Sequence, residues 1–117
     1  MKINKELKEI IEENPIALAT SKNNLPNISV AAFVKIKEDK IVITNNYMNT
    51  TIENIKSNNK IGLVVWDKDW KGYQISGNAE YFENGKWFEF VKSIKENKNE
   101  PCNGAIVIEI NNIKQIG

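Results

Sequence analysis

Six short apolar segments, each rich in β-branched residues and each bounded by polar turn residues, restrict the fold more than any other feature of this sequence. None of them approaches the roughly 20 apolar residues that a membrane-spanning helix needs. Segments of this length and composition are typical of β-strands. We expect turns at residues 21–27 and 37–40. The sequence predicts strands at residues 16–20, 28–36, 41–44, 60–66, 73–82 and 104–110.

Apolar residues recur at helical spacing in three other places, which predicts short helices over residues 3–13, 51–57 and 86–96. Gly77 lies within the fifth strand and predicts a bulge or a close backbone approach. Mostly antiparallel strands with short turns and flanking helices predict an α+β fold. We therefore expect a small six-stranded β-barrel in which residues 1–117 form a single domain.

The absence of two residue types excludes several kinds of chemistry. The sequence contains no His, and all 16 of its basic residues are Lys. A Ser-His-Asp or Cys-His catalytic site cannot be built without His, and a bidentate clamp on phosphate cannot be built without Arg. With one cysteine and no His, ordinary structural zinc is excluded as well. If the protein performs a reaction, we expect a bound cofactor to supply the chemistry.

Charge and the N-terminal sequence set expectations for partners and location. The net charge is +1 and both signs are mixed along the chain, which argues against nucleic acid as a partner. The first fourteen residues are charged and amphipathic and lack the apolar core of a signal peptide. We therefore expect a cytoplasmic protein that does not span a membrane.

Cys102 lies in a polar segment and is interpreted as an incidental thiol, since a redox role requires a lowered pKa.

The segment ITNNYMNTTIENI, residues 43–55, joins a predicted strand to a predicted helix and allows two interpretations. In the first, Thr50 and Glu53 form a capping box at the start of the helix. In the second, free N–H groups at the helix N-terminus and the nearby hydroxyl and amide side chains surround an anion such as phosphate. In that case Thr44 and Asn45, at the end of the strand, lie opposite Thr50 and Thr51.

Two longer segments resemble a known family. NPIALATSKNNLPNISVAAFV (14–34) and KIVITNNYMNTTIENIKSNNKIGLVVWDKDWKGYQISGNAEY (40–81) are similar to short FMN-binding split-barrel flavoproteins. These proteins belong to the pyridoxamine 5′-phosphate oxidase-like superfamily. The resemblance rests on the order of four blocks, P-x-A-x-A-T, I-V-I-T, Y-M-x-x-T-x-x-N-I and G-x-A-E. It implies a split β-barrel and a homodimer that binds FMN at the subunit interface.

The resemblance also implies positions for the cofactor. The flavin ring is expected to lie along the second and third strands, at Ser29, Val30 and Ala31, where backbone groups would recognise it. The small residues there are equally consistent with tight core packing. The FMN phosphate is expected at the start of the second helix. Its predicted ligands are Thr44, Asn45, Thr50, Thr51 and Asn54.

Two departures from the family pattern affect the predicted function. Relatives usually carry Lys, or an Arg-Lys pair, where this sequence has Thr50-Thr51, so we expect weaker FMN binding unless Lys56, or Lys71 of the partner subunit, compensates. Relatives that oxidise pyridoxamine 5′-phosphate hold the substrate phosphate with Arg and His, and this sequence has neither. We therefore expect a protein that is not a true pyridoxamine phosphate oxidase.

The aromatic segment WDKDWKGY (66–73) allows several interpretations. In one interpretation Trp66 and Tyr73 pack in or beside the barrel, whereas Trp70, between charged neighbours, is expected to be exposed. Alternatively, one of the aromatic rings stacks on the flavin or on a flat substrate across the dimer interface, and Trp66 is included in the predicted site. Single-stranded nucleic acid would also stack on such rings, but the neutral overall charge argues against it.

Together these features predict an FMN-dependent oxidoreductase or electron-transfer protein that receives electrons from a nicotinamide or another small molecule. The alternative is a non-catalytic protein on the same barrel that binds or senses a flavin or another flat ligand.

Overall fold

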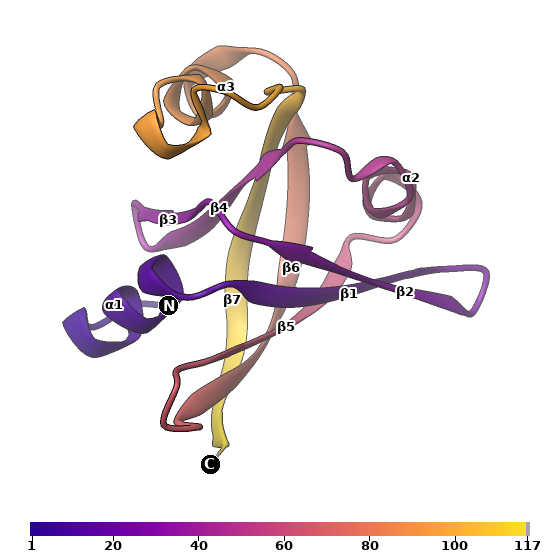
Figure 1. The fold of residues 1–117 in the computed structure, drawn as a ribbon. Helices are drawn as coiled ribbons and strands as arrows, with labels where there is room; N and C mark the ends of the chain where they lie inside the picture. Colours follow the sequence, from indigo (N-terminus) through magenta and orange to yellow (C-terminus); the bar gives the residue numbers. More distant parts are fainter. Residues whose placement is uncertain (117) are drawn as a thin grey trace.

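Seven strands form one curled antiparallel sheet, drawn in Figure 1 for the computed structural model, which describes residues 1–116. The strands are β1 (Ile16–Lys22), β2 (Leu25–Ala31), β3 (Val34–Lys37), β4 (Lys40–Asn45), β5 (Lys60–Trp66), β6 (Gly72–Phe82) and β7 (Gly104–Ile116). Their order across the sheet is β2-β1-β5-β6-β7-β4-β3. The predicted α+β class and split-barrel architecture are confirmed, with seven strands in place of six.

The additional strand arises because the predicted strand 28–36 is interrupted at Ala32 and Phe33. β2 and β3 are consecutive in the chain but lie at opposite edges of the sheet. A link of two residues can join them only if the sheet curls until its edges meet, and Ala31 and Val34 are buried there. β2 and β3 are not paired with each other, so the barrel is not closed by hydrogen bonds between its edge strands.

Alternation along the strands fills the barrel with aliphatic side chains, as a half-buried strand requires. In β1, for example, Ile16, Leu18 and Thr20 are buried, whereas Ala19 faces outward. β4 is buried on both faces, which explains its unbroken IVIT sequence. Its residues Ile41 and Ile43 belong to the barrel core, and Val42 belongs to a second cluster. That smaller cluster also contains Trp87, Val91, Ile94, Ala105 and Val107.

Three α-helices surround the sheet: α1 (Lys5–Glu13), α2 (Asn49–Ser57) and α3 (Gly85–Lys92). α3 is shorter than the predicted 86–96 and is followed by a 3₁₀ turn, η1 (Lys95–Asn97). No helix within residues 1–116 has both the length and the apolar character to cross a membrane.

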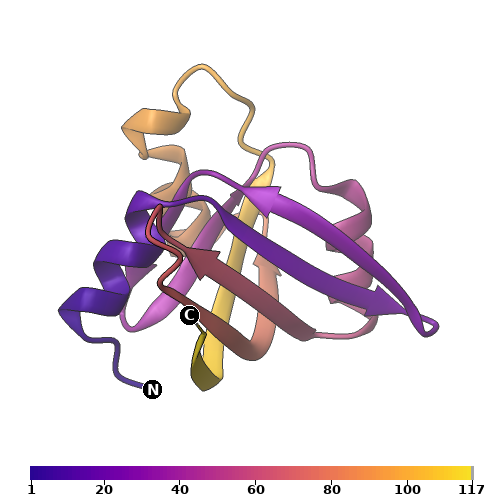
Figure 2. The same cartoon turned by 60° about the horizontal axis from the view of Figure 1, so that its bottom comes forward.

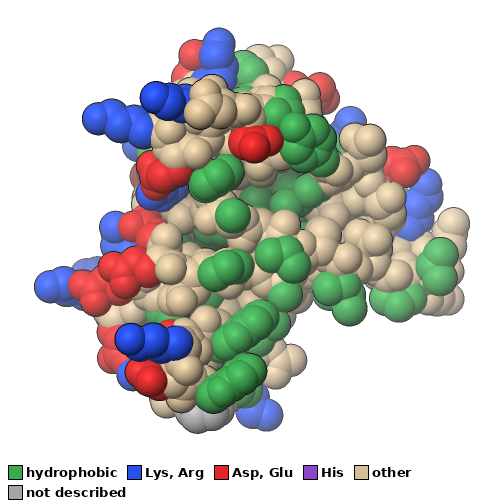
Figure 3. All heavy atoms as spheres, in the orientation of Figure 1, with side chains coloured by type: hydrophobic (Ala, Val, Ile, Leu, Met, Phe, Trp, Pro, Cys, Tyr) green, Lys and Arg blue, Asp and Glu red, His purple; other side chains and the backbone are tan. Residues whose placement is uncertain are grey.

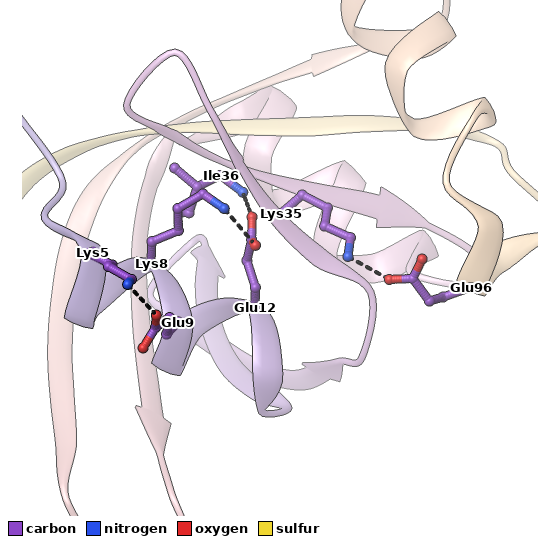
Figure 4. Close-up of polar contacts among 7 residues, drawn as sticks. All are labelled: Lys5, Lys8, Glu9, Glu12, Lys35, Ile36 and Glu96. Carbon is purple, nitrogen blue, oxygen red and sulfur yellow. Dashed lines mark hydrogen bonds and ion pairs between the residues drawn. The ribbon is translucent and has the colours of Figure 1, made fainter.

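α1 covers one end of the barrel and is fixed there by polar contacts as well as by packing. Asn4 caps its N-terminus by accepting a hydrogen bond from the backbone N–H of Leu7 at 2.9 Å. The Glu12 carboxylate accepts one bond from the backbone N–H of Ile36 at 2.8 Å and one from Lys8 (Figure 4). In the same view Lys35 of β3 pairs with Glu96 of η1. These contacts join α1, β3 and η1.

Two tight hairpins use residues with positive φ, as two-residue turns of the I′ type require. Glu38 and Asp39 form the predicted turn between β3 and β4, with φ of 54° and 58°. Asn23 and Asn24 form the turn between β1 and β2, with φ of 53° and 64°. The predicted turn over 21–27 is therefore too long. The β1–β2 hairpin reaches out on the side of α2 in both ribbon views (Figures 1 and 2).

The last strand also differs from the prediction, because β7 continues to Ile116 instead of ending at Ile110. Its second half pairs with the first half of β6, and the register shifts at Ser76/Gly77. A Cβ atom at Gly77 would lie 2.2 Å from the Glu109 carbonyl oxygen. The bulge and close backbone approach predicted at Gly77 are confirmed.

Candidate functional site

The start of α2 differs from the predicted capping box. The N-cap residue is Met48, and no side chain caps the helix, so the interpretation of Thr50 and Glu53 as a capping box is wrong. Instead, Asn45 orders the approach to the helix: its Oδ1 accepts a bond from the backbone N–H of Met48 at 2.8 Å. The first bond of the helix joins the Ile52 N–H to the Met48 carbonyl at 3.0 Å. The N–H groups of residues 49–51 therefore have no acceptor within the helix.

Hydroxyl and amide side chains fasten α2 to the edge of the sheet. The buried Thr51 hydroxyl lies 3.0 Å from the Ser29 hydroxyl and accepts a bond from Asn27 Nδ2 at 3.3 Å. One turn later, Asn54 Nδ2 donates to the Thr20 hydroxyl at 3.1 Å. The structure thus brings together three of the predicted site residues, Ser29, Thr51 and Asn54. Each of these side chains has at least one hydrogen-bond partner within the protein.

A pocket of about 600 Å³ lies between the tip of the β1–β2 hairpin and α2. It offers an ammonium group, three side-chain amides and a hydroxyl, and no carboxylate is among its described lining residues. No acidic residue lies in the first turn of α2 either. Such a set of donors suits an anion. The lining residues are Lys22, Asn23, Leu25, Pro26, Asn27, Thr50 and Asn54.

Thr44 and Asn45, the strand-end residues of the predicted site, lie apart from this pocket. Asn45 is buried, and its Nδ2 donates to the Tyr81 hydroxyl at 2.9 Å. That hydroxyl in turn donates to the Asn103 carbonyl at 3.0 Å, and burial raises the pKa of Tyr81, so the phenol stays protonated. Asn45 therefore shapes the loop before α2.

Thr44 lies on the other face of β4. Strand alternation puts its side chain with that of Val42, on the side covered by α3. Its hydroxyl is buried and has no hydrogen-bond partner among the residues that the structure describes. The structure does not bring Thr44 together with Thr50 and Thr51.

The edge strand β2 presents its two faces differently. Asn27, Ser29 and Ala31 turn toward α2 and the barrel, whereas Ile28 and Val30 point outward and are 74% and 64% exposed. β1 is the only strand beside β2 in the sheet of residues 1–116. Alternate backbone N–H and C=O groups of Ser29, Val30 and Ala31 therefore face the open side of the sheet without a strand partner.

The outward side chains belong to a larger apolar surface over β2, β1 and β5, which we call the outer face (Figure 3). Val30, Ala17 and Val64 lie in one cross-strand row, and Ile28, Ala19 and Gly62 lie in the next. Because the residues in the middle of these rows are small, the face contains a hollow of about 500 Å³. Within residues 1–116, Ile28 and Val30 of the outer face stay largely exposed.

The aromatic turn after β5 borders the outer face. A second hollow, of about 470 Å³, is lined by Val64, Trp66, Trp70, Gly72 and Ile116. Trp66 is 39% exposed, so it lies beside the barrel and not inside it. Tyr73 does pack against the core, and Trp70 is exposed as expected.

Lys71 is fixed within its own subunit. The Asp67 carboxylate accepts bonds from the backbone N–H groups of Asp69 and Lys71, which orders the turn. The Lys71 ammonium pairs with Glu6 of α1. Strand pairing puts the hairpin tip that lines the pocket beyond the start of β5 and the turn beyond its end, a separation of roughly 20 Å for a seven-residue strand. Lys71 does not reach the pocket of its own subunit.

The carboxylates and the single thiol are the other reactive groups of the chain. No group of three or more His, Cys, Asp or Glu side chains within residues 1–116 is arranged to hold a metal ion. Burial raises the pKa of the Cys102 thiol, so it is protonated at neutral pH. This agrees with the interpretation of Cys102 as an incidental thiol.

Sequence reasoning missed the hairpin residues that line the pocket, Lys22 and Asn27 among them. Asn27 carried a signal, because it lies two and four residues before Ser29 and Ala31 and so shares their face of the strand. No sequence signal marked Lys22 as a site residue, since only the folded hairpin brings it near α2.

Comparison with known proteins now gives the family. Residues 3–116 match the family described as pyridoxamine 5′-phosphate oxidase. The chain is 28% identical to the uncharacterized protein MJ0282 of Methanocaldococcus jannaschii, over 97% of this chain and 80% of that one.

Solved structures share the fold. The structure of HupZ from Group A Streptococcus superposes with a TM-score of 0.88 at 24% identity, covering 97% of this chain and 94% of the other. An FMN-binding protein from Syntrophomonas wolfei superposes with a TM-score of 0.77 at 20% identity, covering 94% and 83%. Because the family match extends over nearly the whole chain, this protein belongs to the pyridoxamine 5′-phosphate oxidase family.

Proposed function

We propose that this protein binds FMN between the open edge of β2 and the start of α2, and that it acts as a small oxidoreductase or electron-transfer flavoprotein in the cytoplasm. One observation carries the proposal: as residues 1–116 describe it, the pocket beside α2 is rich in donors, has no carboxylate in its lining, and adjoins a strand edge with unpaired backbone groups. An anionic tail and a flat hydrogen-bonding ring need these two surfaces side by side. Family membership and the fold shared with an FMN-binding protein support this choice of ligand.

Each residue of the site would have a limited role. Backbone groups of Ser29, Val30 and Ala31 would hydrogen-bond the edge of the ring. The Thr50 hydroxyl and the free N–H groups of the first turn of α2 would hold the phosphate. Thr51 and Asn54 would chiefly fix α2 against the sheet, since their side chains already bond to Ser29 and Thr20. Asn45 would shape the loop, and we assign Thr44 no contact with the ligand.

We further propose a homodimer formed through the outer face. Its exposed aliphatic and tryptophan side chains have the character of an interface core. In one subunit the turn at 67–71 lies too far from the pocket at the hairpin tip to contact a phosphate bound there. Trp66, Trp70 and Lys71 would therefore contribute to a flavin site only from the partner subunit, with Lys71 leaving Glu6 to do so.

A bound flavin supplies hydride and electron transfer, which no side chain of this sequence offers. The protein would position the ring, exclude water and provide donors along one edge. We assign no protein acid or base. The oxidation of pyridoxamine 5′-phosphate itself is not proposed, because a second phosphate would have to be held without Arg or His. A nicotinamide or another small molecule would deliver the electrons.

Absorption spectroscopy of the purified protein with added FMN tests the proposal. We expect a flavin band that shifts on binding and is bleached by NADH or NADPH. Binding without bleaching by either nicotinamide would favour the alternative, a carrier or sensor. A protein that binds no FMN at all contradicts both functions.

The substitution Thr50→Lys tests the position of the phosphate. Because it restores the cation usual in relatives, it should tighten FMN binding about tenfold or more, the strength of one hydrogen bond to a charged group. Fluorescence titration measures this affinity. Unchanged or weaker binding would argue against a phosphate at the start of α2.

A further inference from the structure

We propose that Lys22, at the tip of the β1–β2 hairpin, is the cation that binds the phosphate of the flavin and makes the site select a phosphorylated ligand. This inference rests on the proposed function and assigns a role to a residue outside the four family blocks that resemble this sequence. It explains how a chain with Thr50-Thr51 at the start of α2, and with no Arg, can hold an anion there.

The first argument is location. Lys22 and Thr50 line the same pocket although they are distant in sequence and belong to different elements. Asn27 and Asn54 line it as well, so Lys22 shares the pocket with neutral donors. A cation within a ring of amides and hydroxyls gives an anion both charge and directed hydrogen bonds.

The second argument is that Lys22 is not committed elsewhere. Seven lysines take part in ion pairs within residues 1–116, and Lys22 is not one of them. The two lysines expected from the sequence to replace the missing cation are both paired, Lys56 with Glu83 and Lys71 with Glu6. Lys22 therefore meets a phosphate without first losing a carboxylate partner, at least within the part of the chain described.

The third argument is that the backbone of Lys22 is held in place. The two residues before it are tied to the α2 region, since Thr20 accepts a bond from Asn54 and Ser21 accepts one from Asn58 at 3.1 Å. The two residues after it, Asn23 and Asn24, form the tight turn. Only the lysine side chain itself must be ordered when the anion binds, which limits the entropic cost.

The neutral members of the pocket can adjust to an anion. Asn54 donates to the Thr20 hydroxyl, and because a hydroxyl can donate as well as accept, the Asn54 amide can turn over and present its N–H groups to the pocket. The free N–H groups at the start of α2 already carry partial positive charge. Lys22 adds the full charge that these groups lack.

Fluorescence titration with FMN and with riboflavin, which lacks the phosphate, tests this role. Lys22→Gln should weaken FMN binding about tenfold or more and leave riboflavin binding unchanged. Lys22→Glu should weaken FMN binding further, and Lys22→Arg should restore it. The difference between the native protein and Lys22→Gln should shrink as salt is added, because salt screens an exposed charge.

Lys98→Gln is the matched control, since Lys98 is exposed, lies outside the pocket and takes part in none of the ion pairs within residues 1–116. It should bind FMN as the native protein does. If Lys22→Gln binds FMN as tightly as the native protein, or loses affinity for both flavins equally, the role of Lys22 is refuted and FMN binding stands. If the native protein binds neither flavin, the proposed function fails and this role fails with it.

Discussion

The hydroxyl of Thr51, in the first turn of α2, lies 3.0 Å from the hydroxyl of Ser29 in the edge strand β2. Thr51 is 1% exposed, and Asn27 donates to the same oxygen. This buried contact fixes the distance between the open strand edge and the start of the helix, which are the two halves of the proposed site.

Removing the Thr51 hydroxyl should therefore destabilise the fold. Thr51→Val keeps the shape of the side chain but leaves Ser29 and Asn27 without their shared partner. We expect the free energy of unfolding to fall by about 1–3 kcal/mol, the cost of unsatisfied buried polar groups. Urea denaturation measures this change. The control Thr50→Val, at an exposed position of the same turn, should change stability by no more than about 0.5 kcal/mol. An equal loss in both variants would contradict the structural role of Thr51.

Gly77 should tolerate no side chain. Gly77→Ala would bring its Cβ to 2.2 Å from the Glu109 carbonyl oxygen, so β6 and β7 would have to separate at the bulge. We expect a loss of about 1–3 kcal/mol, as for other overpacked sites. Gly62→Ala is the matched control, since a Cβ at Gly62 meets nothing within 4 Å. Thermal unfolding measures the stability of both variants. Equal stability would show that β6 and β7 separate at the bulge without cost and would contradict this prediction.

These two sites show what the sequence could and could not predict. A glycine within an otherwise regular strand pattern indicated the Gly77 bulge, because few other causes place Gly there. The hydroxyl-rich segment 43–55 indicated a polar junction at α2. It could not show that the Thr51 hydroxyl would face Ser29 while Thr50 lines a pocket, because that choice depends on how the helix rotates against the sheet.

The outer face should mediate dimer formation. Ile28 is 74% exposed on this face, and Ile28→Lys would put two ammonium groups into a two-fold interface, one from each subunit. We expect the native protein to sediment as a dimer and the variant to dissociate at least about tenfold more readily, because two buried aliphatic contacts are lost.

Tyr47→Lys provides the control for the outer face. Tyr47 is 72% exposed but lies in the loop before α2, where its hydroxyl donates to Glu100, and a lysine could pair with the same carboxylate. Its sedimentation should match that of the native protein. A native monomer, or equal dissociation of both variants, would argue against this interface.

Cys102 should react slowly with alkylating reagents at neutral pH. Burial raises the pKa of its thiol, and only the thiolate reacts, so the folded protein holds less reactive sulfur than an unfolded chain at the same pH. We measure the rate of iodoacetamide modification against pH. The pH at which this rate rises should be higher for the folded protein than for the urea-denatured protein. Coinciding pH profiles would show that the folded structure leaves this thiol unperturbed.

The fold itself was predictable where local pattern determines structure. β-Branched segments gave the approximate position of every strand, but they missed the break at Ala32-Phe33, the hairpin ends of β1 and β2, and the second half of β7. That break follows from sheet closure, since the chain must pass from one edge of the sheet to the other there, and no local residue preference marks it. Lys22 is a similar case, because its place in the pocket depends on the pairing of the hairpin and on its contacts with α2.

The position of β7 between β6 and β4 has a consequence for how the chain folds during synthesis. The segments that form β1, β2, β5 and β6 can pair with one another as they emerge from the ribosome, and β3 can pair with β4. These two partial sheets have no shared strand until residues 104–116 are available. Nascent chains that lack residues 104–116 should therefore expose strand edges with unpaired backbone groups. Such edges bind chaperones and promote aggregation.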